Sequence, residues 1–145
     1  ITPRVELLLM FAARCQHIQD VIRPALDKGE IVICDRFTDA SYAYQGAGRG
    51  IASADIKTLE TWVQQEIKPD LTLLFDAAVE TGFARLSARG NKDRFEKEDR
   101  DFFETIRQAY LDRANDEPER IRIIDAEQTI PGVQSQINSI LESVY

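Results

Sequence analysis

The chain has 145 residues, of which 43% are hydrophobic and 30% are charged, and its formal net charge is −7. This size and composition are typical of a globular protein with a real core, and they predict a single domain over residues 1–145. The acidic balance argues against nonspecific nucleic-acid binding, which needs a basic face, but not against a nucleotide, which needs few cations. The sequence has no apolar run of about 18 residues and no signal-peptide pattern, so we expect no membrane segment.

Helical spacing of apolar residues is the first feature along the chain. Thr2 and Pro3 are typical of a helix start, and the apolar spacing continues to about residue 28. Gly29 is expected to end this helix, and Pro24 to kink it or begin its last turn.

Three short apolar runs that follow predict buried strands, at 31–35, 71–76 and 121–125. Further helices are predicted over 53–67, with Ser53 as the cap and a stripe of Ile56, Leu59, Val63 and Ile67; from Val79 to Gly90; around 102–110; and over 133–144. Strands that alternate with helices predict an α/β protein, with a parallel sheet covered by helices on both faces.

Each predicted strand ends in an aspartate, namely Asp35, Asp76 and Asp125. Ligands of open parallel sheets bind beyond the carboxyl ends of the strands, although aspartate is also a common loop and cap residue. At Asp35 the carboxylate could hold a metal-bound water, while the following Arg36 could grip a phosphate with its fork of donors. The alternative is an Asp-Arg pair that neutralises itself.

A basic cluster, "RLSARGNKDR", occupies residues 85–94 of this acidic chain. Its cations are Arg85, Arg89, Lys92 and Arg94. A mobile basic loop over about 86–96 would suit closure on a polyphosphate. The alternative is that these cations offset a helix dipole and face solvent.

Arg14 stands inside an otherwise apolar helical stretch, so a buried guanidinium is expected there. Such a group needs a partner, either a core carboxylate or a ligand carbonyl. Cys15 and Cys34 form no metal-ligand spacing and are interpreted as buried, reduced thiols of a cytoplasmic protein. His17 is interpreted as a surface or core histidine and Trp62 as a packing residue.

Several stretches together resemble the bacterial thymidylate kinases. They are "LLLMFAARCQHI" (7–18), "VIRPALDKGEIVICDRFTDASYAYQGAGRG" (21–50), "KPDLTLLFD" (68–76), "RLSARGNKDRFE" (85–96) and "IIDA" (123–126). The resemblance implies a three-layer, P-loop NTPase-like parallel sheet. It also implies transfer of the ATP γ-phosphoryl group to thymidine 5′-monophosphate (dTMP) with Mg²⁺, a step of dTTP biosynthesis, in a homodimer that uses the first helix.

The resemblance also implies roles for residues around the nucleoside. Arg14 would hydrogen-bond the thymine, and Met10 or Phe11 would pack on the base. Ser41 and Gln45 would line the base side of the pocket.

The phosphates and the sugar would contact a second group. Arg36 would bind the acceptor phosphate, Asp35 would lie by Mg²⁺ and its waters, and Tyr44 would select the deoxy sugar. Arg89 would be the main lid arginine, with Arg85 and Arg94 in support, and the loop after Asp125 would lie near the adenine.

The sequence departs from the family pattern at two points. The base-stacking position is usually aromatic, whereas four residues before Arg14 stands Met10. The phosphate-binding motif G-x-x-x-x-G-K-[ST] does not occur in these 145 residues, and the glycines at 46, 48 and 50 do not replace it. We therefore expect the C-terminal two thirds of the fold, with its first two strands before Ile1, and no activity from this chain alone. The alternatives are another nucleotide or nucleoside kinase and a non-catalytic nucleotide-binding module.

Overall fold

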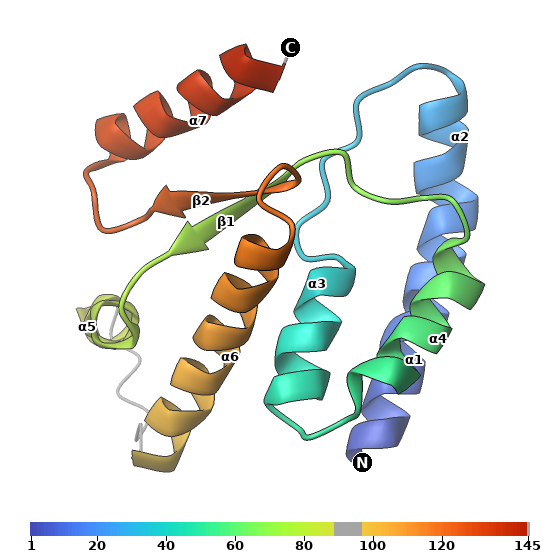
Figure 1. Ribbon diagram of the computed structural model, residues 1–145, viewed down its shortest axis with the longest axis horizontal. Helices are drawn as coiled ribbons and strands as arrows, with labels where there is room; N and C mark the ends of the chain where they lie inside the picture. Colours follow the sequence, from blue (N-terminus) through green and yellow to red (C-terminus); the bar gives the residue numbers. More distant parts are fainter. Residues whose placement is uncertain (89–96, 145) are drawn as a thin grey trace. The chain divides into compact units, whose positions relative to one another are not determined.

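The computed structural model describes residues 1–88 and 97–144 (Figure 1). The chain divides into two compact units, Ile1–Lys68 and Pro69–Tyr145. The single domain expected over 1–145 therefore stays a prediction. No helix of the described residues is long and apolar enough to cross a bilayer.

A nearly continuous helical segment opens the first unit. It consists of α1 (Pro3–His17), the π-helix η1 (Ile18–Ile22) and α2 (Arg23–Asp27). The hydroxyl of Thr2 accepts the backbone N–H of Val5 at 3.4 Å, which confirms the predicted helix start. Pro24 lies in the first turn of α2, directly after the π-helix, where its missing N–H is tolerated. Gly29, with φ +76°, follows the last turn, as the sequence predicts.

Three more helical elements complete this unit, namely α3 (Thr38–Ser41), the π-helix η2 (Tyr42–Ala47) and α4 (Ser53–Gln64). The sequence did not predict α3 and η2, because their stretch is rich in glycine and lacks an apolar repeat. The predicted start of α4 at Ser53 is confirmed, but its cap and its end differ from the prediction. Ala52, and not Ser53, is the N-cap and makes no side-chain bond, and the positive φ of +53° at Gln65 ends the helix before Ile67.

The core of the first unit lies between α1 and α4, which run side by side in Figure 1. Leu7, Phe11 and Ile56 form its buried centre. Leu59 and Val63 pack against it, so the predicted apolar stripe of α4 is confirmed up to the end of the helix. Each fully buried side chain of this kind stabilises the fold by roughly 1.5–3 kcal/mol.

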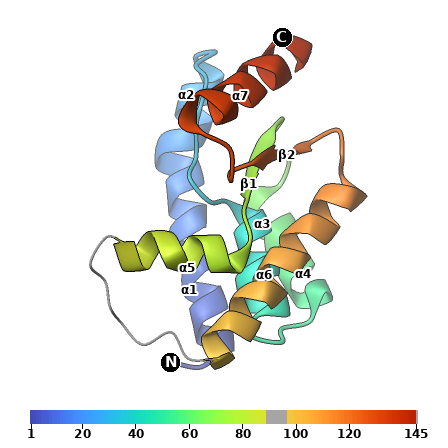
Figure 2. The same ribbon diagram turned by 90° about the vertical axis from the view of Figure 1, so that its left-hand side faces the viewer.

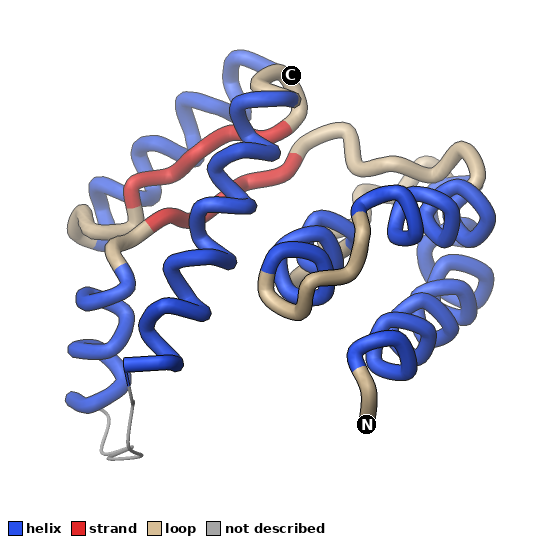
Figure 3. Tube along the Cα trace, turned by 60° about the horizontal axis from the view of Figure 1, so that its bottom comes forward, coloured by secondary structure: helices blue, strands red, loops and turns tan. Residues whose placement is uncertain are grey.

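The strand predicted at 31–35 does not form. Residues 31–34 have no regular structure and appear as a tan loop in Figure 3, and Ile33 is 94% exposed. A strand needs a hydrogen-bonded neighbour, and no segment of the described residues pairs with this one. Its apolar, β-branched composition is therefore insufficient by itself.

The interpretations of Cys34 and Trp62 as buried residues were wrong, and His17 lies at one of the two places expected for it. Cys34 is exposed rather than buried, because it belongs to the same unpaired segment, whereas Cys15 is half-buried. Trp62 is 77% exposed, because its position on α4 faces away from the stripe that packs on α1. His17 lies on the helix surface.

The second unit contains a parallel pair of strands, β1 (Thr72–Asp76) and β2 (Ile121–Asp125). In the register of the pair, Thr72 lies opposite Ile121 and Asp76 opposite Asp125. The helices are α5 (Val79–Ala88), α6 (Lys97–Asp116) and α7 (Ile130–Val144). Figures 1 and 2 show α6 and α7 on opposite sides of the strands, which confirms an α/β arrangement with helices on both faces. Gly90 lies outside the described residues.

Candidate active site

Arg14 is the buried centre of the candidate site in the first unit. It is 8% exposed, and its Nη2 donates to the Phe37 carbonyl oxygen at 3.2 Å and to Ser41 Oγ at 3.3 Å. Its Cζ lies 4.6 Å from the ring centre of Phe11 and 5.3 Å from that of Phe37. Burial lowers the pKa of Arg14. Its Nη1 is buried and no described residue accepts a hydrogen bond from it, so one charged donor is available to a ligand acceptor.

The partners of Arg14 narrow the choice that the sequence left open. A backbone carbonyl and a hydroxyl hold the guanidinium, and no carboxylate of the described residues is hydrogen-bonded to it. Within this part of the chain, a core carboxylate is therefore not its hydrogen-bond partner, although the charges of Glu60 and Asp39 raise the pKa of Arg14 against the effect of burial. Sequence reasoning missed Phe37, although its place next to Arg36 was the available signal.

The residues expected to face the base have different surroundings. Phe11 is 2% exposed and serves the core and the Arg14 contact, whereas Met10 is 44% exposed. Ser41 is buried beside Arg14, which brings two predicted site residues together. Gln45 is also buried, and its Nε2 donates to Glu6 Oε1 at 2.7 Å. The roles of all four on a base stay predictions.

Arg36 and Tyr44 meet through a cation–π contact. The Arg36 Cζ lies 4.4 Å from the centre of the Tyr44 ring. The φ of Arg36 is +63°, a left-handed conformation that costs a non-glycine residue roughly 1–3 kcal/mol and clusters at functional sites. Asp35 and Arg36 are exposed, and they form no ion pair with each other, so the self-neutralising alternative is not observed.

Asp35 is the residue that could serve a magnesium ion. Among the described residues, no group of three or more His, Cys, Asp or Glu side chains could hold a metal. Mg²⁺ in kinase sites usually keeps several waters and binds through one or two carboxylates together with substrate phosphates. The exposed carboxylate of Asp35 fits this mode, because it is next to Arg36, which is expected to bind a phosphate, and forms no ion pair with it.

In the second unit, the aspartates at the strand ends have structural partners. Asp76 accepts two hydrogen bonds from Arg107, at 2.7 Å from Nε and 2.9 Å from Nη2, and this bonding raises the pKa of Arg107. Asp125 accepts the Gln128 side-chain amide at 2.8 Å and the Glu127 backbone N–H at 2.9 Å, and both lower its pKa. Asp125 thus holds the turn after β2, in line with the loop role that the sequence left open, whereas Asp76 forms an ion pair that the sequence did not predict.

The first part of α5 is fixed to the turn that follows β2. Glu127 Oε1 accepts the Thr81 hydroxyl at 2.7 Å and the Ala78 backbone N–H at 3.0 Å, and these two bonds lower the pKa of Glu127. Arg85 Nη2 donates to the Ala126 carbonyl oxygen at 2.9 Å. Sequence reasoning missed Glu127, because a contact across 46 residues leaves no local signal.

The other cations of the basic cluster cannot be placed. Arg89, Lys92 and Arg94 lie outside the described residues. The lid predicted over about 86–96, and the phosphate roles of its arginines, stay predictions.

Comparison with solved structures first gives the class of protein. A crystal structure of thymidylate kinase from Ehrlichia chaffeensis superposes with a TM-score of 0.75 at 26% sequence identity, over 100% of this chain and 68% of that one. The fold is therefore the P-loop NTPase-like α/β fold of that kinase, with helices covering a parallel sheet.

Sequence comparison then gives the family. The model of the thymidylate kinase family matches residues 1–137. The chain is 60% identical over 139 residues to the thymidylate kinase of Ectopseudomonas mendocina (strain ymp), and 56% identical over 144 residues to that of Pseudomonas fluorescens (strain SBW25). It covers 66% of the first relative and 69% of the second, about two thirds of their length. The chain belongs to the thymidylate kinase family.

Proposed function

We propose that the protein, in its natural form, transfers the γ-phosphoryl group of ATP to dTMP and produces dTDP. The observation that carries this proposal is Arg14, a buried charged group whose Nη1 has no hydrogen-bond partner in the described part of the chain. Leaving such a donor unsatisfied costs roughly 1–3 kcal/mol, so its retention favours a ligand acceptor. Membership of the thymidylate kinase family supports the choice of ligand.

The choice of base follows from the chemistry of Arg14. Thymine presents a carbonyl oxygen where cytosine presents an amino group, and a guanidinium can only donate. A site built on this donor can bind the thymine carbonyl. With cytosine, the Arg14 N–H would face an amino group, and neither of these two donors would have an acceptor. Met10 is the exposed candidate for packing on the base, and Ser41 holds Arg14 in place.

The transfer itself depends on positioning and charge. An oxygen of the acceptor monophosphate attacks the γ-phosphorus of ATP, the bond from that phosphorus to the bridging β,γ-oxygen breaks, and ADP leaves with the electron pair. Arg36 holds the acceptor phosphate with its planar fork of donors. Arg85, Arg89 and Arg94 are proposed to neutralise charge on the transferring group. When bound with ATP, Mg²⁺ would supply positive charge to the phosphates, and Asp35 is the residue that would hold it through a water.

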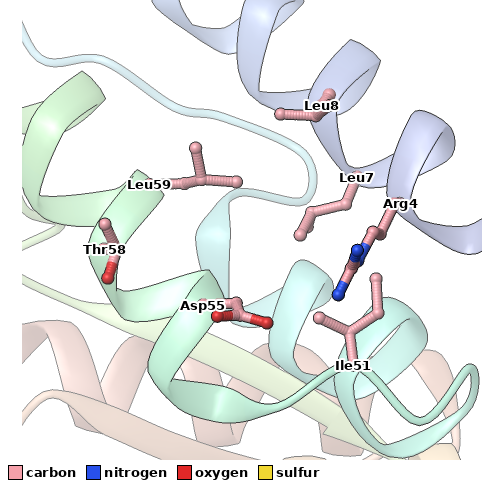
Figure 4. A pocket seen from close by; sticks show the side chains of 7 residues that line it. All are labelled: Arg4, Leu7, Leu8, Ile51, Asp55, Thr58 and Leu59. Atoms are coloured by element: carbon pink, nitrogen blue, oxygen red, sulfur yellow. The ribbon is translucent and has the colours of Figure 1, made fainter.

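We also propose that the protein is a homodimer. Val5, Leu8 and Leu9 are large apolar residues of α1 with much of their surface exposed. A groove of about 320 Å³ lies next to them between α1 and α4 (Figure 4). Arg4 and Asp55 lie on its two sides, among the lining residues Arg4, Leu7, Leu8, Ile51, Asp55, Thr58 and Leu59.

A cytoplasmic location and a role in dTTP biosynthesis complete the proposal.

The test of the proposed function is an acceptor comparison with the natural protein. Formation of ADP from ATP is followed with dTMP, uridine monophosphate and deoxycytidine monophosphate. We expect dTMP to give the highest kcat/KM, and Arg14→Met to remove most of the preference for dTMP over deoxycytidine monophosphate. A preference for deoxycytidine monophosphate would contradict the assignment of Arg14 to a carbonyl, and nucleotide binding without turnover would favour a non-catalytic module.

A further inference from the structure

The aromatic ring of Tyr44 lies under a cation that has no carboxylate partner. Arg36 forms none of the ion pairs observed among the described residues, although Asp35 is its direct neighbour in the sequence. Its guanidinium carbon is 4.4 Å from the ring centre, which is well inside the range of a cation–π contact. The Arg36 side chain is thus held by a ring and not by an anion.

This choice of partner has a chemical consequence. A carboxylate would use two of the five N–H groups of the guanidinium and cancel its charge. An aromatic face contacts the guanidinium plane instead and leaves the N–H edge and the charge available. The side chain is held in one place, yet all of its capacity for a bidentate anion is preserved.

The backbone has an uncommon geometry at both residues of the contact. Arg36 has the left-handed φ of +63°. Tyr44 belongs to the π-helix η2, and π-helices are rare in proteins overall but often occur at functional sites. The backbone conformation at Arg36 sets the direction of its side chain, and the π-helix η2 carries the Tyr44 ring that contacts it. Both features lie within residues 36–47, in the first unit.

We propose that Tyr44 is a positioning residue for Arg36. The face of its ring fixes the guanidinium before the acceptor binds, so that less side-chain entropy is lost when the phosphate arrives. This role is additional to any contact of the Tyr44 hydroxyl with the sugar, and it rests on the proposed function for the identity of the phosphate.

The test is a double-mutant cycle on the affinity for dTMP. Tyr44→Leu in the natural protein should weaken dTMP binding two- to fivefold, the range of an exposed cation–π contact. In an Arg36→Met background the same change should weaken dTMP binding less, because the cation is gone and only a contact of Tyr44 with the sugar remains. Thymidine, which has no phosphate, should respond to Tyr44→Leu to the same extent in both backgrounds.

Two variants separate the ring face from other roles of Tyr44. Tyr44→Phe keeps the ring and should retain the coupling to Arg36, whereas a role of the hydroxyl alone would lose it. Tyr42→Leu is the matched control, because Tyr42 belongs to the same π-helix and donates to Glu60 at 2.7 Å. It should show no coupling to Arg36.

A second readout does not depend on the nucleotide. The δ-methylene protons of Arg36 should show an upfield ring-current shift by NMR, kept in Tyr44→Phe and lost in Tyr44→Leu. An equal effect of Tyr44→Leu on dTMP affinity in both backgrounds, or an unshifted Arg36, would overturn the positioning role. A wild-type protein that shows the shift but does not bind dTMP would instead contradict the proposed function.

Discussion

Replacement of Arg14 by methionine tests whether this buried arginine serves the ligand or the fold. The change keeps an apolar chain of similar length and removes the charge and its donors. Two hydrogen bonds of about 1 kcal/mol each and two ring contacts of about 0.5–1 kcal/mol each are lost. The unsatisfied Nη1, which costs the folded protein roughly 1–3 kcal/mol, is removed at the same time. We therefore expect a net destabilisation of at most about 3 kcal/mol.

The effect on the ligand should be larger. A hydrogen bond from a charged donor contributes about 1.5–3 kcal/mol, so the affinity for dTMP should fall roughly 10- to 150-fold. Chemical denaturation gives the free energy of unfolding, and calorimetric titration gives the affinity. Arg23→Met is the matched control, because Arg23 lies in the same helical segment as Arg14 but pairs with an exposed residue, Glu66.

Two results would refute this reasoning about Arg14. A loss of stability above about 3 kcal/mol would show that the guanidinium is needed for the fold and is not poised for a ligand. An unchanged affinity for dTMP would show that the free donor does not meet the base. In the control, both quantities should remain close to those of the wild type.

Three further predictions concern the rest of the described chain. Asp76→Asn should lower the free energy of unfolding by about 1–3 kcal/mol in urea denaturation, because it leaves the half-buried Arg107 without its bidentate anion; an unchanged midpoint would contradict a structural role. The pKa of Glu127 is lowered by its bonds to Thr81 and Ala78, so its stabilisation is present above the unfolded pKa of about 4.3 and is lost as the pH falls through the folded value. The difference in thermal midpoint between wild type and Glu127→Gln should thus narrow below about pH 4, and a constant difference would argue against the shift. Ile33→Thr in the 145-residue chain should change stability by less than about 0.5 kcal/mol, whereas a cost above about 1 kcal/mol would mean that this side chain is covered.

The sequence by itself determined the elements that depend on local periodicity and on end signals. The first helical segment follows its cap at Thr2 and ends before Gly29 as predicted, because capping and glycine conformation are properties of neighbouring residues. The strands at 72–76 and 121–125 formed because each supplies the other with a hydrogen-bonding neighbour. The motif residues around Arg14 and Arg36 were sufficient to point to a nucleotide kinase family.

The tertiary structure alone decided what depends on partners far along the chain. The apolar segment at 31–35 reads like a strand, but pairing is a property of two segments, and its isoleucines remain exposed. The sequence indicated that Arg14 needs a partner, but only folding brings Phe37 and Ser41 to it and leaves Nη1 without a hydrogen bond among the described residues. Contacts such as Glu127 with Thr81 or Arg36 with Tyr44 arise from the path of the backbone, which no local pattern records.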